Sequence, residues 1–429
     1  TMYYYMYRVA KLYPNLTRYL DANGYLERAF GTAKDFFTVP NELTHWSAYG
    51  TGTYDELVIP KIVRALRENG HPQQADWLEA HWQKKVEYFV NDHPDLFQSE
   101  YPFDSTGFES TEALAKYAME NARLPGDPAS ASPLIDSFQH QVSYQDASDF
   151  LHEQIRLNIG DRGWLEPAYY DLGSDYRGRG NAGYTLSYMS QMGGWAVLDY
   201  ALHFARNPLP DLSLGYASYL SSWALLNAGT KASNYGYWYP GKNNDGGASG
   251  GFEPRPWGQA WFGNKVMGRG PWWYSGEIDL GFTGALRSAA TIVVDDPIFG
   301  LYAYGGKLAR KKSLVEVVPR DGLRARFHIF LGADRLHILL ARDGFKKGSP
   351  VVFDRSLSRM TFTLENRASG RHQTTILIAG LPSGVYQVNL DGHPFERFSS
   401  NGSQGNEIRV PMTGATLQVQ FARIASSIH

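Results

Sequence analysis

The stretch MTFTLENRASGRHQTTILIAGL, residues 360–381, decides how the second part of this chain folds. In RMTFTLE (359–365) apolar and polar residues alternate, which is the period of a strand with one buried face. The polar, glycine-containing NRASG that follows is typical of a turn. HQTTILIAGL then resumes a β-branched, apolar run. The sequence predicts two consecutive strands separated by a turn.

Strand patterns of this kind continue from about residue 291 to the C-terminus. Segments bounded by Gly, Pro, Asn or Asp recur there: LVEVVP, LRARFHIFL, RLHILLA, MTFTLEN, HQTTILIAGL, VYQVNLDG, NEIRVPM and ATLQVQFA. Eight or more strands within about 130 residues are typical of an antiparallel sandwich. We therefore expect a C-terminal β-sandwich domain over residues 291–429.

The spacing of apolar residues before that point is helical. Segments with this pattern are 2–13, 25–37, 54–69, 73–90, 109–122, 146–159, 185–206, 213–228 and 280–292. In 54–69, Gly70 suits the position just after the helix, and Pro60 marks a kink or the first turn. Helices followed by strands indicate two packed units rather than a parallel α/β sheet, so the fold class is α+β multidomain.

Composition excludes several classes of function. The 429 residues carry a net charge of −2, so no basic excess points to nucleic acid. Cysteine is absent, which excludes disulfides and thiolate chemistry. No apolar run reaches the roughly 20 residues that a membrane span needs. No dinucleotide, phosphate-loop, nucleophile-elbow or zinc-protease motif occurs.

The segment Asn234–Asp279 is rich in aromatic residues and glycine but poor in aliphatic residues. It is long for a loop, and long ordered loops usually carry function. Aromatic side chains stack on the apolar faces of sugar rings, and packing under their own loop is the structural alternative. We expect the segment to line a sugar-binding groove, with these contributors: Tyr235, Tyr237, Trp238, Trp257, Trp272 and Trp273.

Many helices with long connections, followed by a β-sandwich, resemble the six-hairpin (α/α) toroid enzymes that act on carbohydrates. YPFDSTGFESTEALAKYA (101–118), GYTLSYMSQMGGWAVLDYAL (183–202) and NYGYWYPGKNNDGG (234–247) also resemble an uncharacterised family of large microbial, glycosidase-like proteins. The resemblance implies a toroid-like catalytic domain over 1–290, with a cleft at one end of the helical barrel. It also implies a preceding N-terminal segment of the same precursor, because such toroids often follow an N-terminal β-domain.

Glycosidic bond hydrolysis normally needs two carboxyl groups across the scissile bond. A first acidic group, FDSTGFESTE, supplies Asp104, Glu109 and Glu112. Thr106 and Glu109 match a capping box at a helix start, which gives Glu109 a structural alternative. Asp104 precedes the helix and has no such alternative, so it is a leading candidate.

A second acidic group, YSGEIDLG, supplies Glu277 and Asp279 directly after the tryptophan pair. Alternate positions in an extended segment share one face, so the two side chains point the same way. Asp279 has the structural alternative of capping the next helix. Glu277 has no structural duty and is the first choice for a catalytic acid or base.

A third group, EPAYYDLGSDYRGRGN (166–181), supplies Asp171, Asp175 and Arg179. We expect them to grip sugar hydroxyls or a uronate at the edge of the cleft. The alternative is a solvated loop held by ion pairs. KNNDGG (242–247) offers oxygen ligands but lacks EF-hand spacing, so a loop calcium site stays an open alternative and no metal or cofactor is expected.

The alternative chemistry is β-elimination on a uronic acid polymer, which needs a His or Tyr base and a group that neutralises the carboxylate. His140 is the candidate base in SFQHQVSYQDAS, and Arg179 or Asn234 would bind the carboxylate.

The sequence thus predicts a secreted or periplasmic carbohydrate-active enzyme, a glycoside hydrolase acting on a poly- or oligosaccharide. A polysaccharide lyase is the runner-up. A non-catalytic glycan-binding or surface-layer protein is the alternative outside enzymes. The sugar, its linkage, exo or endo action and the oligomeric state do not follow from the sequence.

Overall fold

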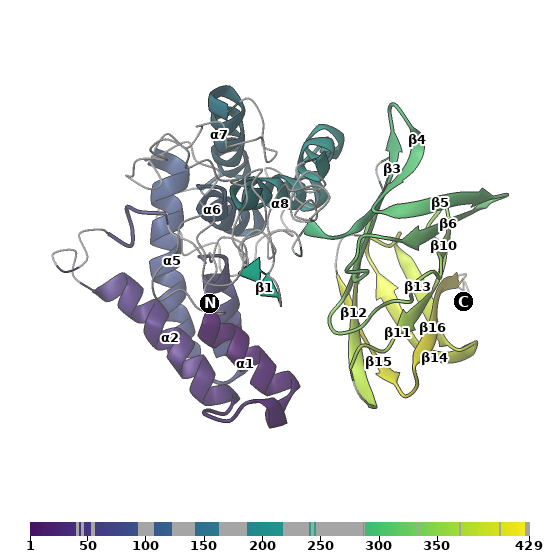
Figure 1. Cartoon of the computed structure of the whole chain (residues 1–429), viewed down its shortest axis with the longest axis horizontal. Coiled ribbons are helices and arrows are strands. Elements are labelled where there is room, and N and C mark those ends of the chain that lie inside the picture. The colour runs from purple at the N-terminus through teal and green to yellow at the C-terminus, as the bar shows by residue number, and fades with distance from the viewer. Residues whose placement is uncertain are drawn as a thin grey trace, which may run out of the picture. The chain divides into compact units, whose positions relative to one another are not determined.

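The computed structural model describes residues 1–39, 43, 47–52, 56–92, 107–121, 142–162, 187–217, 240–241, 244–245, 286, 288–332, 334–368, 370–402 and 405–424. The chain divides into two compact units, Thr1–Ala285 and Leu286–His429 (Figure 1). The first unit is helical and the second is built from strands. Each is described by itself below.

The helical unit contains α-helices and two short 3₁₀ helices. Their bounds are α1 (Met2–Leu12), η1 (Pro14–Leu16), α2 (Ala22–Thr38), η2 (Glu56–Val58), α4 (Ile59–Glu68), α5 (Pro72–Asp92), α6 (Gly107–Asn121), α7 (Tyr144–Arg162) and α8 (Ser187–His203). Two short strands, β1 (Pro240–Gly241) and β2 (Asn244–Asp245), pair with each other. None of the described helices is long and apolar enough to cross a membrane.

The ends of these helices follow from local chemistry. Asp21 caps α2 by accepting a 2.7 Å hydrogen bond from the backbone N–H of Gly24. Pro60 occupies the first turn of α4, where its missing N–H costs nothing. Of the two predicted alternatives, a kink or the first turn, the structure shows the first turn. Gly70 follows the C-cap Asn69 with φ +82°, a left-handed conformation that suits glycine.

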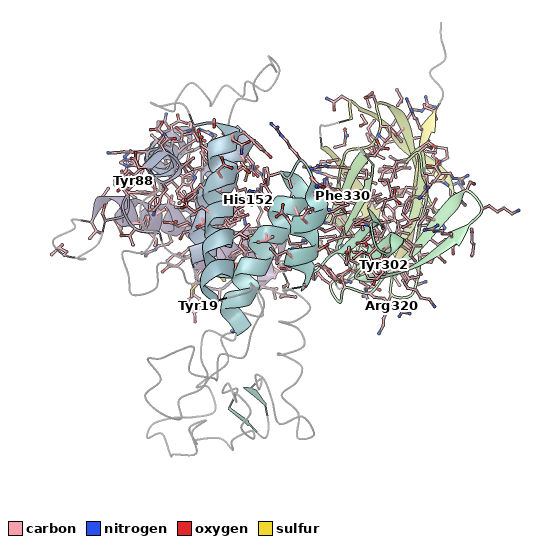
Figure 2. The ribbon with its side chains drawn as sticks, turned by 90° about the horizontal axis from the view of Figure 1, so that it is seen from above. Tyr19, Tyr88, His152, Tyr302, Arg320 and Phe330 are labelled. Carbon is pink, nitrogen blue, oxygen red and sulfur yellow. The ribbon has the colours of Figure 1, made fainter. Side chains whose placement is uncertain are left out.

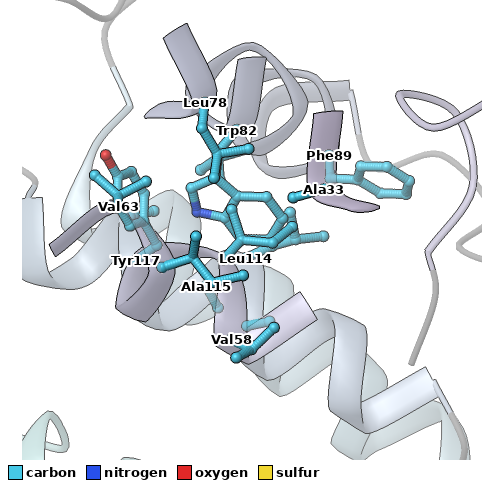
Figure 3. Packing of buried hydrophobic residues seen from close by; sticks show 14 of the residues in the cluster. Ala33, Val58, Val63, Leu78, Trp82, Phe89, Leu114, Ala115 and Tyr117 are labelled. Atoms are coloured by element: carbon cyan, nitrogen blue, oxygen red, sulfur yellow. The ribbon is translucent and has the colours of Figure 1, made fainter. Parts of the chain in front are cut away.

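Helix α6 lies at the centre of the unit and contacts α5, α7 and α8. The Trp82 side chain of α5 is fully buried, and Figure 3 shows it packed with Leu78 against Leu114 and Ala115 of α6. Burying aromatic and aliphatic side chains of this kind is the main source of stability in such a core.

The second unit consists of two sheets. Its strands are β3 (Thr291–Asp296), β4 (Gly300–Tyr304), β5 (Gly306–Lys311), β6 (Leu314–Pro319), β7 (Arg326–Leu331), β8 (Asp334–Leu340), β9 (Gly344–Phe345), β10 (Val351–Asp354), β11 (Arg359–Glu365), β12 (His372–Ala379), β13 (Gly384–Leu390), β14 (His393–Ser400), β15 (Asn406–Met412) and β16 (Thr416–Ile424). One sheet has the order β14-β13-β16-β11-β10-β6-β5, with β9 also paired to β11. The other has the order β15-β12-β8-β7-β3-β4.

One hydrophobic core joins residues from both sheets. Phe353, Phe362 and Phe421 of the first sheet belong to the same buried cluster as Phe327 and Ile338 of the second. Alternate residues of each strand supply this core, as in β11, where buried and half-buried positions alternate. The pairing is antiparallel except between β3 and β7, which run parallel.

The predicted order of helices followed by an antiparallel-rich β region is confirmed, and all eight predicted strands are present. The prediction of a helix over 280–292 is wrong at its end, because β3 begins at Thr291. The toroid arrangement of the helices stays a prediction.

Candidate functional site

Of the residues predicted to act in catalysis, the structure describes only the backbone of Glu109. Asp104, His140, Glu277 and Asp279 fall outside the described residues. Glu109 is the third residue of α6, the position a capping box requires, but its side chain is not among those described. The predicted substrate-binding residues also lie outside: Tyr235, Tyr237, Trp238, Trp257, Trp272, Trp273, Asp171, Asp175 and Arg179.

The described residues with the most perturbed ionisation lie between α6 and α8. We call this cluster the acid seam, and it consists of Glu112, Lys116, Glu120, Asp199 and His203. The first three are four residues apart along α6, so they share one face of that helix. Asp199 and His203 are likewise four residues apart on α8. Helical spacing thus brings two rows of ionisable groups together.

Asp199 is the best-connected member of the seam. Its Oδ2 accepts a 2.6 Å hydrogen bond from Lys116 Nζ, and its Oδ1 lies 3.1 Å from His203 Nδ1. Burial acts to raise the pKa of Asp199, but Lys116 and His203 outweigh it and hold this pKa well below its ordinary value. Asp199 is therefore an ionised carboxylate at neutral pH.

The pKa of Glu112 is shifted in the opposite direction. Its side chain is almost fully buried, and neither oxygen accepts a hydrogen bond from a described residue. Lys116 Nζ is 3.8 Å from Oε1. Burial raises the pKa of Glu112 well above its ordinary value, and Asp199 adds to the rise while Lys116 opposes it. Glu112 is therefore harder to deprotonate than an ordinary glutamate.

The remaining members set the charge around this carboxyl pair. Burial acts to lower the pKa of Lys116, but Asp199 and Glu112 hold it above its ordinary value, so Lys116 stays charged. Burial raises the pKa of Glu120, and Lys116 partly offsets that rise. Lys116 and Asp199 keep 29% and 19% of their side-chain surface exposed, so solvent reaches the seam from their side.

Two carboxyl groups with oppositely shifted pKa values are the arrangement that acid–base catalysis uses. A carboxyl group whose pKa is raised can donate a proton at higher pH than an ordinary glutamate, and a nearby ionised carboxylate adds to that rise. Lys116 bridges the two groups, 2.6 Å from Asp199 and 3.8 Å from Glu112. Because Asp199 is tied to Lys116, the pair supplies the proton donor of such a reaction and requires another carboxylate for the other side.

Sequence reasoning found only part of the acid seam. Glu112 appeared in the first acidic group but was not chosen, and Asp199 was missed. The signal for Asp199 was a single acid inside the apolar run WAVLDYAL, opposite a single lysine in ALAKYA. Lone opposite charges in two apolar helices indicate a buried pair, because neither charge is stable there alone.

A second pair of ionisable groups lies where α5 meets residues 47–52. The Tyr49 hydroxyl is hydrogen-bonded to Nδ1 of His81, whose ring centroid is 4.0 Å from that of Trp77. Burial and the nearby Lys84 lower the pKa of His81. Burial raises the pKa of Tyr49. At neutral pH His81 is thus uncharged, and in the tautomer with its proton on Nε2 it accepts a hydrogen bond from the Tyr49 hydroxyl.

Metal binding has no support in the part of the chain that the structure describes. No group of three or more His, Cys, Asp or Glu side chains is arranged there to hold an ion. The side chains of KNNDGG lie outside that part.

Comparison with known proteins gives a family but no activity. No curated protein matches the chain. Among solved structures, a GH127 β-L-arabinofuranosidase from Geobacillus stearothermophilus T6, Ara127N-Se, is similar at 10% identity. The match covers 92% of this chain and 76% of that one, with a TM-score of 0.23, which does not define a shared fold. A family model, described as a family of unknown function, DUF5695, matches residues 1–124 and 272–412. Because these residues make up more than half of the chain, the protein belongs to the DUF5695 family.

Proposed function

We propose that this protein is a carbohydrate-active enzyme, a glycoside hydrolase that cleaves a poly- or oligosaccharide outside the cytoplasm. The observation that carries the proposal is the carboxyl pair of the acid seam, which Lys116 joins and in which the pKa of Glu112 is raised and that of Asp199 is lowered. Hydrolysis of a glycosidic bond begins with protonation of the leaving oxygen by a carboxyl group whose pKa is raised.

The roles follow from the ionisation states. Glu112 is the proton donor, and the negative charge of Asp199 helps to raise its pKa. Lys116 keeps Asp199 ionised through its 2.6 Å contact. The carboxylate on the other side of the scissile bond would come from the acids predicted by the sequence, first Glu277 and then Asp104.

The class of substrate rests on the sequence. The aromatic segment Asn234–Asp279 is expected to supply stacking surfaces, with Asp171, Asp175 and Arg179 as polar partners. A helical unit followed by a β unit supports the same class, because it is the element order that the carbohydrate-active toroid enzymes show. The toroid domain over 1–290 and the sandwich over 291–429 are part of this proposal.

A polysaccharide lyase is the second candidate, favoured by the Tyr49–His81 pair. β-elimination needs a base for the C5 proton of a uronic acid, and a neutral histidine such as His81, hydrogen-bonded to Tyr49, can serve. Lys84 Nζ, 4.7 Å from the centre of the Tyr49 ring, would attract the uronate. His140 was the base predicted from the sequence, and Tyr49–His81 is an alternative among the described residues.

A polysaccharide screen separates these functions. The full chain is incubated with neutral and uronic acid polysaccharides, and new reducing ends and near-ultraviolet absorbance are measured together. New reducing ends without absorbance support hydrolysis. Absorbance supports the lyase, because elimination leaves a conjugated double bond. Retention of a glycan without any product would show a non-catalytic binder, and neither binding nor product would refute the carbohydrate proposal.

A further inference from the structure

The β3–β4 hairpin carries a group of exposed apolar side chains on an otherwise polar surface. Ile298, Phe299 and Tyr302 are 83%, 63% and 41% exposed. Figure 1 shows this hairpin projecting beyond its neighbouring strands, and Tyr302 is labelled in Figure 2. Exposed apolar side chains that lie together on a surface often mark a binding site, whereas isolated ones do not.

Two aromatic rings of the hairpin form a surface on which a ring can stack. The centroids of Phe299 and Tyr302 are 5.1 Å apart, with 34° between the ring planes. Tyr304 packs edge-on against Tyr302, at 5.2 Å and 79°. Two rings this close and this nearly parallel pack partly face to face, so a ligand can stack on the outer face of the pair, and the third ring supports it edge-on.

A buried carboxylate holds this turn in one conformation. Asp296 Oδ1 accepts hydrogen bonds from the backbone N–H groups of Ile298 and Phe299, at 2.7 and 2.9 Å. Its Oδ2 accepts a 2.7 Å bond from the Tyr304 hydroxyl. The aromatic pair is therefore preorganised, which lowers the entropy cost of binding.

A guanidinium group lies next to Gly300 of the same hairpin. A Cβ placed on Gly300, between Phe299 and Tyr302 in the chain, would be 3.9 Å from Nη2 of Arg310. Within the described residues no carboxylate lies within 4.0 Å of Arg310, Lys307 or Lys312, the neighbouring cations of β5 and its turn. Of the nearby acids, Asp295 is paired with Arg355 and Glu316 with Lys311, whereas Asp296 keeps its negative charge because its three donors are neutral. Among these described side chains the three unpaired cations outnumber that one carboxylate, so their net charge is positive.

We propose that Phe299, Tyr302 and Arg310, the hairpin platform, bind a uronic acid residue of a glycan chain. The apolar face of the sugar ring stacks on the aromatic pair, and its carboxylate pairs with the guanidinium. Lys307 and Lys312 attract the neighbouring acidic residues of the same chain. The choice of a sugar over another anion rests on the proposed function, whereas the negative charge of the ligand rests on the platform itself.

Affinity electrophoresis of the full chain tests this proposal. Gels contain polygalacturonate, alginate or neutral β-glucan, and dissociation constants follow from the retardation. We expect retardation by a uronic acid polymer and none by β-glucan. Tyr302→Ala and Arg310→Ala should each weaken binding about tenfold, the loss of one stacking or charge-assisted contact. Phe395→Ala and Arg409→Ala, at exposed positions on β14 and β15, should bind as the wild type does.

The opposite results overturn the proposal. They are no retardation by either uronic acid polymer, equal retardation by β-glucan, or unchanged binding in Tyr302→Ala. Stronger retardation by polyglutamate through the same residues would also overturn it and assign the platform to an acidic peptide. Product formation is measured on the same polymers. Tyr302-dependent binding without product refutes only the proposed function, and product without such binding refutes only the platform.

Discussion

Lys116 of α6 donates a 2.6 Å hydrogen bond to the Asp199 carboxylate of α8, one turn of α6 away from the buried Glu112. This contact decides which of the two carboxyl groups has the lower pKa. Lys116 interacts more closely with Asp199 than with Glu112, from which it is 3.8 Å away, so it lowers the pKa of Asp199 more.

The charge of Asp199 should set the pH range of activity. It raises the pKa of Glu112, so Asp199→Asn should lower that pKa. Glu112 then loses its proton at lower pH, and the basic limb of the kcat/KM profile should move down by about one pH unit. The profile is measured on the substrate found in the screen, with melting curves to show that the variant folds. An unmoved limb would assign the titrating proton to another group.

The buried ion pair of Glu56 and Lys85 should contribute strongly to stability once one partner is lost. Both side chains are almost fully buried. Glu56→Ala leaves the Lys85 charge uncompensated, which should cost about 3–5 kcal/mol of unfolding free energy. Glu68→Ala, which breaks an exposed pair with Lys11, should cost less than about 1 kcal/mol. The unfolding free energies of the two variants are measured by urea denaturation. Equal losses would contradict the larger contribution of the buried pair.

The β unit depends on a glycine at position 380. Gly380 has φ +84°, and a Cβ there would lie 1.6 Å from the carbonyl oxygen of Arg335. Gly380→Ala should therefore lower the unfolding free energy by more than the roughly 1–2 kcal/mol of left-handed strain alone. Gly414→Ala, whose Cβ would meet nothing closer than 3.8 Å, is the control. Similar melting temperatures for both variants would show that the backbone relaxes around position 380.

Acid should destabilise the β unit through Glu365. Burial acts to raise the pKa of Glu365, but the Lys347 N–H, Arg367 and Arg324 outweigh it and hold this pKa below its ordinary value. A depressed carboxyl pKa contributes stability in full above the unfolded pKa, near pH 4.3, and the contribution disappears as pH falls through the folded pKa. Melting temperatures between pH 7 and pH 3 should therefore fall less in Glu365→Gln than in the wild type. Glu407, which forms an exposed ion pair with Arg409, is the control, and the melting temperatures of Glu407→Gln should follow the wild-type curve.

The predictability of the β unit depended on how each strand is buried. NEIRVPM and LVEVVP coincide with β15 and β6, because their alternate residues enter the core. β3 was not predicted, and its first two residues were assigned to a helix, because Thr291–Val294 are buried on both faces and show no alternation. β14 was not predicted from the sequence, because HPFERFSS is mostly exposed at a sheet edge and gives no apolar pattern.

The candidate site was less predictable than the fold. Acids near aromatic residues were easy to select, but a pKa depends on what surrounds a group in space. Glu112 gains its raised pKa from burial and from Asp199, which is 87 positions away in the chain and on another helix. No local pattern specifies that α6 faces α8, so the pair emerges only from the packing.

The most direct test of the central claim is the rate of Glu112→Gln on the polysaccharide that the wild type cleaves. Glutamine keeps the shape of the side chain but has no acidic proton to donate. The account predicts a loss of about 10²–10⁴-fold in kcat with unchanged melting temperature, while Glu27→Gln, at an exposed site on α2, keeps full activity. A Glu112→Gln enzyme that is as fast as the wild type would contradict the account and leave the acid seam as a structural tie between α6 and α8.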